Sequence, residues 1–255
     1  MRFIDTHTHL YLEEFGADID EVIKRAKAAG VSKFYLPAID SDIINDILHL
    51  ESSNPDNFFA MMGLHPVSVK ENYKTELKIV EEYLTKRRFV AIGEIGLDYY
   101  WDTTFKEQQL EAFTIQMEWA LHYNIPIVIH TRNAMRDTID AVKPFSGRGL
   151  TGIFHCFGDD YETAKEITGM GFYLGIGGVV TYKKANLQES LKDIPIESMV
   201  LETDAPYLTP VPYRGQRNES SYLVLIAQKL AEIKNVSIEE VATITTMNAE
   251  KIFGR

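Results

Sequence analysis

The sequence predicts an α/β protein, a (βα)8 TIM barrel with C-terminal closing helices, on three observations. Eight short apolar runs alternate with longer segments of helical periodicity. If the runs end at 7, 38, 65, 96, 130, 155, 177 and 204, the intervals are 31, 27, 31, 34, 25, 22 and 27 residues. These intervals are close to the length of one βα unit, about 30 residues. Eight such units in 255 residues give the usual size of this barrel.

The predicted strands are near-continuous apolar runs, as expected for parallel strands buried on both faces. In chain order they are "RFIDTH" (2–7), "KFYLPA" (33–38), "FFAMMGLH" (58–65), "FVAIGEIG" (89–96), "IPIVIH" (125–130), "LTGIFH" (150–155), "GFYLGIG" (171–177) and "SMVLETD" (198–204).

The predicted helices have a 3.6-residue apolar period, clearest in 19–30 and 105–123. Gly30 and Gly171 stand where helices should end before the next strand. Residues 220–254 predict two helices that close the barrel, and Ser237 with Glu240 forms a capping box for the second.

A doubly wound open sheet is the alternative fold, but no G-x-G-x-x-G follows the first strand to favour it. No Pro/Gly/Ser-rich linker or charge block divides the chain, so we expect residues 1–255 to form a single domain.

Composition narrows the function. The 26 basic and 37 acidic residues give a net charge of −11, which is unsuited to coating duplex DNA. The single cysteine, Cys156, permits no intrachain disulfide and favours a reducing compartment. No apolar stretch reaches the roughly 18 residues of a membrane helix, and Asp5, His7 and His9 interrupt any signal-peptide core. We therefore expect a soluble cytoplasmic protein, monomeric, without a membrane or protein partner.

Polar residues gather at the C-terminal ends of the predicted strands. They are His7 and His9, His65, Glu94, His130, His155, Glu202 and Asp204. In a TIM barrel these ends meet at the mouth where active sites lie, so residues nearly 200 positions apart should converge. A buried ring of imidazoles and carboxylates would be costly to desolvate unless metal ions balanced it.

This set of side chains predicts two divalent metal ions. His7, His9 and Asp204 could hold one, His130 and His155 the other, with Glu94 bridging both. A mixed His/carboxylate set suits Zn²⁺, Mn²⁺, Fe²⁺, Ni²⁺ or a weakly held Mg²⁺ and does not choose among them.

Seven short blocks of the sequence contain most of these residues. They are "DTHTHL", "GLHP" (63–66), "GEIGLDYY" (93–100), "IVIHTRNA" (127–134), "FHCF" (154–157), "LETDAPYLTP" (201–210) and "RGQRNE" (214–219). Together the blocks resemble the TatD family of metal-dependent deoxyribonucleases, within the amidohydrolase superfamily of TIM barrels. The resemblance implies a DNA substrate, phosphodiester hydrolysis at DNA ends, and metal ligands at the six positions already named.

The remaining predictions concern roles within the site. Asp204 should accept the proton of the attacking water, and His65 should donate to a phosphate oxygen or the leaving group. Glu202 should orient a histidine or an arginine. Arg132, Arg214 and Tyr207 should contact substrate, beside the aromatic residues of 98–101, whereas Arg217 should be solvated and Cys156 should point away from the metals into the core.

Two other functions stay open from the sequence. One is a metallohydrolase of the same barrel acting on a small-molecule ester, amide or aminoacyl ester, since fold and metals do not fix the substrate. The other is a non-catalytic, metal-dependent binding protein.

Overall fold

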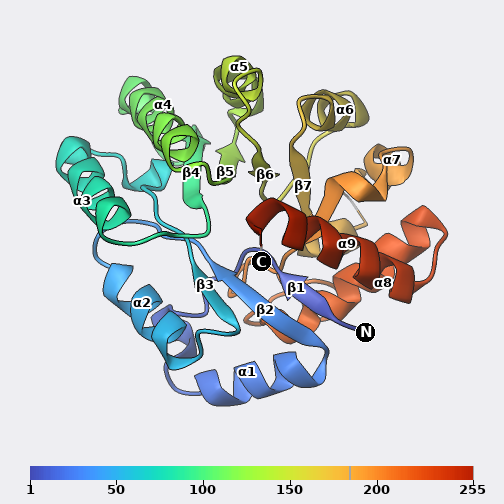
Figure 1. Cartoon of the computed structure of the whole chain (residues 1–255). Helices are drawn as coiled ribbons and strands as arrows, with labels where there is room; N and C mark the ends of the chain where they lie inside the picture. The colour runs from blue at the N-terminus through green and yellow to red at the C-terminus, as the bar shows by residue number, and fades with distance from the viewer. Residues whose placement is uncertain (184, 255) are drawn as a thin grey trace.

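A computed structural model describes residues 1–183 and 185–254 and shows strands alternating with helices around a barrel (Figure 1). The strands are β1 (Phe3–Asp5), β2 (Val31–Leu36), β3 (Phe58–Ala60), β4 (Ile92–Asp98), β5 (Ile127–Arg132), β6 (Gly152–Phe154), β7 (Tyr173–Ile176) and β8 (Met199–Leu201). The helices are α1 (Ile19–Ala28), α2 (Ile44–Ser53), α3 (Tyr73–Lys86), α4 (Lys106–Tyr123), α5 (Met135–Ser146), α6 (Tyr161–Gly169), α7 (Leu187–Lys192), α8 (Leu223–Lys234) and α9 (Ile238–Phe253). The predicted fold class is confirmed.

The strands run parallel in chain order, in two sheets that meet at both sides. One sheet is β1-β2-β3 and the other β4-β5-β6-β7-β8. A parallel bridge between Met62 and Ile92 joins β3 to β4, and the Thr6 amide donates to the Leu201 carbonyl at 3.1 Å to join β1 to β8. The carboxyl ends of all eight described strands therefore surround one mouth.

Apolar side chains fill two layers. One lies between the strands and the ring of helices, and the other lies inside the barrel. The inner layer includes Ile4, Tyr35 and Val200 and is covered by Phe253 of α9, whose ring stacks on Tyr35 with centroids 3.9 Å apart. The predicted closing helix α9 thus packs across the barrel end opposite the mouth (Figure 1).

The helix ends agree with the expected capping residues. Gly30 and Gly171 follow α1 and α6 with φ of 93° and 85°, a region where a side chain would be strained. At the start of α9, the Ser237 hydroxyl accepts the Glu240 amide at 3.2 Å.

Several strands end earlier than the apolar runs that predicted them. β1 stops at Asp5, β6 at Phe154 and β8 at Leu201. His7, His155 and Asp204 therefore lie in the turns that follow these strands. None of the described helices has the length and apolar character needed to cross a membrane.

Candidate metal centre

Five imidazoles and two carboxylates converge at the mouth of the barrel. Six of them, His9, His65, Glu94, His130, His155 and Asp204, line a cavity of about 810 Å³ together with the aromatic and apolar residues of its wall. His7 is fully buried beside them. The predicted convergence of strand-end residues is what the structure shows.

Glu94, in the middle of β4, divides the histidines between its two oxygens. Its Oε2 lies 3.2 Å from His7 Nε2 and 3.8 Å from His9 Nε2. Its Oε1 lies 2.9 Å from His130 Nδ1, 3.4 Å from His65 Nε2 and 3.7 Å from His155 Nε2. A carboxylate whose two oxygens face two different groups of imidazoles has a geometry that suits a bridging ligand.

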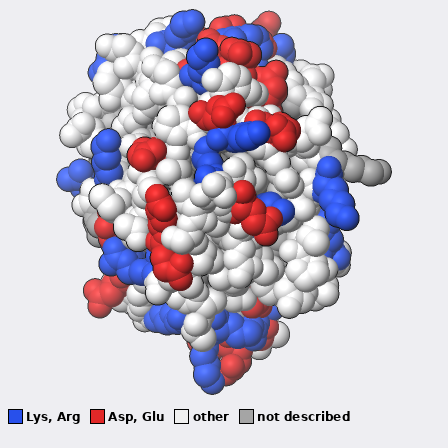
Figure 2. Space-filling view, turned by 90° about the vertical axis from the view of Figure 1, so that its right-hand side faces the viewer, with Lys and Arg blue, Asp and Glu red and all other residues white. Residues whose placement is uncertain are grey.

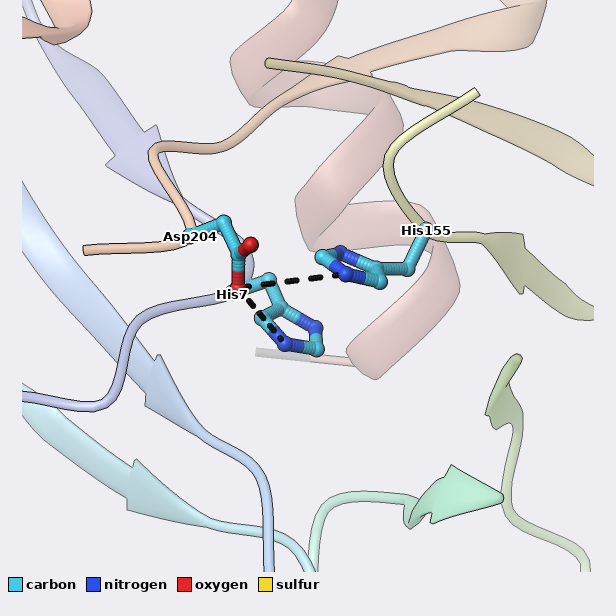
Figure 3. Close-up of side chains that lie close together, drawn as sticks. All are labelled: His7, His155 and Asp204. Carbon is cyan, nitrogen blue, oxygen red and sulfur yellow. Dashed lines mark ion pairs between the residues drawn. The ribbon is translucent and has the colours of Figure 1, made fainter. Parts of the chain in front are cut away.

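Asp204, in the turn after β8, lies close to three of the same histidines. Its Oδ1 lies 3.6 Å from His7 Nε2 and 3.8 Å from His155 Nε2, the two ion pairs drawn in Figure 3. The rings of His7 and His155 stack with centroids 3.6 Å apart. His9 Nε2 lies 3.4 Å from Asp204 Oδ1 and 3.2 Å from His7 Nε2. The predicted set His7, His9 and Asp204 is therefore one compact group.

Carboxylates also lie behind two of the histidines. Asp98 Oδ2 is 2.8 Å from His130 Nε2, on the ring edge away from Glu94. Glu202 Oε1 is 2.9 Å from His155 Nδ1, and the same oxygen accepts the Cys156 amide at 2.7 Å. The expectation that Glu202 orients a histidine agrees with this contact. Such partners fix which nitrogen of a ligating histidine faces the metal.

Below the histidines, a buried hydroxyl network fastens β1 to the segment after β8. The Asp5 carboxylate accepts from the Thr203 hydroxyl at 2.7 Å, the Thr203 amide at 3.0 Å and the Ser220 hydroxyl at 2.6 Å. Asp5 and Thr203 are both fully buried. Because these residues stand two before His7 and one before Asp204, the network fixes the spacing between the backbones of His7 and Asp204.

Burial and neighbouring charge shift the pKa values in opposite directions within the cluster. Burial alone would raise the pKa of Glu94, but His65, His7 and His155 hold it well below its usual value. The pKa of Asp204 is lowered in the same way, against burial, by His155, His9 and His7. Burial would lower the pKa of His155, yet Glu202, Glu94 and Asp204 raise it to about 10. Against burial, Asp98 and Glu94 raise the pKa of His130 as well, whereas burial lowers the pKa values of His7 and His65.

The residues present fit divalent metal binding. Carboxylates that raise the pKa of a buried imidazole, as at His130 and His155, also attract a metal ion, which replaces the imidazole proton on binding. The donor atoms are imidazole nitrogens and carboxylate oxygens, which divalent transition metals accept as ligands. His7, His9 and Glu94 form one group of close ligand atoms, His7, His155 and Asp204 a second, and His65, Glu94 and His130 a third.

The outer wall of the cavity is aromatic and partly exposed. Trp101, Arg132 and Tyr207 line it, and the Arg132 guanidinium lies 3.7 Å from the centre of the Tyr100 ring. Trp101 and Tyr207 are 66% and 48% exposed. Arg214 is outside the set of described residues that line the cavity, and its guanidinium lies 4.0 Å from the centre of the Tyr182 ring.

The sequence interpretation was wrong about two residues. Cys156 lines the cavity, with its Sγ within 4.8 Å of ligand atoms of His155 and Glu202, instead of facing away. The alternation of side chains holds only within a strand, and Cys156 follows the end of β6 with φ of 49°. Arg217 is not simply solvated, because its guanidinium pairs with both oxygens of Asp18 at 2.8 and 2.7 Å.

Three residues of the site were missed. Asp98 ends β4 four residues after Glu94 and lies on the same strand face, so a longer predicted strand would have included it. Asp5 lies two residues before His7 in the same motif, but nothing in the sequence reveals its hydroxyl partners. Tyr11, whose hydroxyl lies 2.6 Å from His9 Nδ1, lies outside any strand and carried no signal.

Comparison with known proteins matches nearly the whole chain to one family. Residues 4–254 match the family described as TatD related DNase. The uncharacterized metal-dependent hydrolase YabD of Bacillus subtilis is 40% identical over 250 residues, covering 98% of each chain. YcfH of Escherichia coli K12, also described as an uncharacterized metal-dependent hydrolase, is 33% identical over 99% of this chain and 96% of its own. The crystal structure of YJJV, a TatD homolog from Escherichia coli K12, superposes with a TM-score of 0.94 at 28% identity, covering 100% of this chain and 98% of that one.

Proposed function

Since this chain belongs to the TatD family of metal-dependent hydrolases, we propose that it is a deoxyribonuclease that cleaves phosphodiester bonds at DNA ends or in single strands. The observation that carries the proposal is the position of Glu94, whose two oxygens serve two separate groups of imidazoles. Families that hydrolyse phosphodiesters commonly use two cations held about 3.5–4 Å apart.

Residues of both groups would hold the metals. His7 and His9 lie near Glu94 Oε2 and Asp204 contacts both of them, whereas His130 and His155 approach Oε1. Two bound cations supply a lowered pKa for an attacking water and positive charge against the developing charge on phosphate. Asp204 is placed to accept the water's proton, because its carboxylate faces the cavity and its neighbouring imidazoles keep it ionised.

His65 is suited to donating a proton rather than binding a metal. Its Nδ1 accepts the Val67 amide at 3.1 Å, so that nitrogen carries no proton. The neutral ring then carries its proton on Nε2, which points to Glu94 Oε1 and the cavity. An Nε2–H that has no free lone pair can donate to a phosphate oxygen or to the leaving group, which is the role expected from the sequence.

The surroundings of the cavity favour strand ends or single strands over long duplexes. Arg132 can donate two parallel hydrogen bonds to a phosphate, and Trp101 and Tyr207 offer ring faces for unpaired bases. The side wall of the barrel shown in Figure 2 also has Lys and Arg side chains interspersed with Asp and Glu, with no continuous basic surface on that face. We retain Arg214 as a further candidate for phosphate contact from the loop after β8.

The test is hydrolysis of single-stranded DNA labelled at one end, with the protein loaded in turn with Mg²⁺, Mn²⁺ and Zn²⁺. We expect metal-dependent shortening from one end. The double variant His130→Ala/His155→Ala should lose this activity, and the matched control His49→Ala, an exposed histidine of α2, should keep it.

Two outcomes would contradict the proposal at different levels. If DNA stays intact while a model ester or amide is hydrolysed in the presence of metal, the deoxyribonuclease assignment fails and a small-molecule metallohydrolase replaces it. If the double variant hydrolyses DNA as fast as the unmodified protein, the site itself is wrongly assigned.

A further inference from the structure

His9 differs from the other histidines of the cluster in the group behind its ring. Asp98 lies behind His130 and Glu202 lies behind His155, and both are carboxylates. Behind His9 stands the phenol of Tyr11, with its oxygen 2.6 Å from His9 Nδ1. A carboxylate can only accept from the ring when ionised, but a hydroxyl can either donate or accept. The contact between Tyr11 and His9 alone therefore does not say which of the two groups donates the hydrogen bond.

The carbonyl of Pro37 settles that direction. It lies 2.6 Å from the Tyr11 hydroxyl, just after the end of β2, and a carbonyl oxygen can only accept. The phenol has a single proton, and it donates that proton to Pro37. Its oxygen then has only lone pairs to offer His9, so His9 Nδ1 must be the donor.

We propose that Tyr11 is a positioning residue that fixes His9 as the Nδ1–H tautomer and so presents Nε2 as a bare ligand atom. Nε2 is the nitrogen that faces Asp204 Oδ1 at 3.4 Å and Glu94 Oε2 at 3.8 Å. The opposite tautomer would leave the Pro37 carbonyl without its proton and put a hydrogen on the nitrogen that faces the metal side. The proposal rests on the proposed function only in taking His9 as a ligand.

The tautomer can be measured without metal or substrate. Ring nitrogens of histidine have distinct ¹⁵N shifts when protonated and when bare, so correlation spectra of metal-free protein at pH 8, above the ordinary pKa of about 6.5, report the tautomer. His9 is assigned by comparison with His9→Gln. We expect a bare Nε2 and a protonated Nδ1 in the unmodified protein, and a mixture of tautomers in Tyr11→Phe.

Metal affinity supplies a second readout. Titration calorimetry with Zn²⁺ alone should show affinity about 10- to 100-fold weaker in Tyr11→Phe, the usual effect of removing a residue that orients a ligand. The matched control is Tyr73→Phe, which deletes the same oxygen from a tyrosine that donates to Glu111 at 2.9 Å on the outside of the barrel. It should bind Zn²⁺ as the unmodified protein does.

The proposal is overturned by either of two results. A bare Nδ1 with a protonated Nε2 on His9 in the unmodified protein would show that the phenol donates to the ring, and this result does not depend on any variant folding. A Tyr11→Phe protein with unchanged His9 tautomer and Zn²⁺ affinity within twofold would show that Tyr11 only packs. If both readouts are as expected but the metal-loaded unmodified protein leaves DNA intact, the proposed function fails and the role of Tyr11 stands.

Discussion

The floor and the rim of the cavity are built in opposite ways. We define the floor as His7, Glu94, Glu202 and Asp204 with their histidine partners, and the rim as Tyr100, Trp101 and Tyr207. On the floor His7 and Glu202 are fully buried and Glu94 is 2% exposed. On the rim Trp101 is 66% exposed, and the rim side chains belong to loops after β4 and β8.

The difference shows how chemistry and recognition are separated in this barrel. Polar groups face the buried charges of the floor, as the imidazoles face Glu94, because a buried charge without partners is costly. Rim residues have few such constraints and offer ring faces to whatever enters the cavity. We therefore expect changes on the floor to abolish hydrolysis, and changes on the rim to alter how well a substrate binds.

The largest effect should come from Glu94→Gln. An amide keeps the shape but loses the charge that both imidazole groups face, so metal content should fall along with hydrolysis. We expect a loss of more than about 100-fold, above the range usual for residues that only orient a ligand. Metal analysis and initial rates provide the measurement, with exposed Glu81→Gln of α3 as the control. Full metal content in Glu94→Gln would contradict the role of this floor residue in metal binding.

Asp98→Asn should have the next largest effect, because Asp98 belongs to both regions. Its Oδ2 contacts His130, and its Oδ1 accepts the amides of Tyr100 and Trp101 at 2.9 and 3.3 Å. We expect kcat to fall about 10- to 100-fold through His130, and KM to rise through the rim loop. Asp102→Asn, in the same loop and paired with Lys70, is the neighbouring control. A change in KM alone would place Asp98 wholly with the rim.

Trp101→Ala tests the rim by itself. Stacking of one base on an aromatic ring is worth about 1–3 kcal/mol, so KM for single-stranded DNA should rise about tenfold or more. The kcat value and bound metal should stay as they are, since the Trp101 side chain is not among the groups of close ligand atoms. Met247→Ala, an exposed residue of α9, is the control. A fall in metal content would contradict the separation of rim from floor.

Arg217→Ala should have the smallest effect. Arg217 pairs with half-exposed Asp18 of the segment before α1, and such pairs contribute at most about 1 kcal/mol. Urea unfolding should show a decrease below that value, with KM for DNA unchanged. Arg25→Ala should cost more, because it deprives the buried carboxylate of Glu219 of its bidentate partner. An increase in KM for Arg217→Ala would assign it to the rim.

The floor could be predicted from sequence because strand ends are marked by where apolar runs stop. That rule gathered His7, Glu94, His130, His155 and Asp204 correctly, although His7 and Asp204 lie in turns beyond their strands. The placement survives this error, since a turn of two or three residues still leaves the side chain at the same mouth. The order of the strands along the chain was enough to place these side chains at one mouth.

Hydrogen-bond partners could not be predicted in the same way. The contact from Tyr11 to Pro37 joins the turn after β1 to the end of β2, and the pairing of Asp5 with Ser220 spans more than 200 residues. Such contacts depend on exact loop paths, which no local pattern encodes. The same limit explains the error at Cys156, where a single left-handed residue redirects the chain.

The hydrogen bonds from the loop after β4 to Asp98 come from main-chain amides, so they do not depend on the side chains of Tyr100 and Trp101. The amides of positions 100 and 101 are present whatever amino acid stands there, proline excepted. Evolution can therefore exchange those two side chains while the anchoring carboxylate and the hydrolytic apparatus beneath it stay fixed. Such a scaffold can therefore acquire new substrates through substitutions at positions 100 and 101.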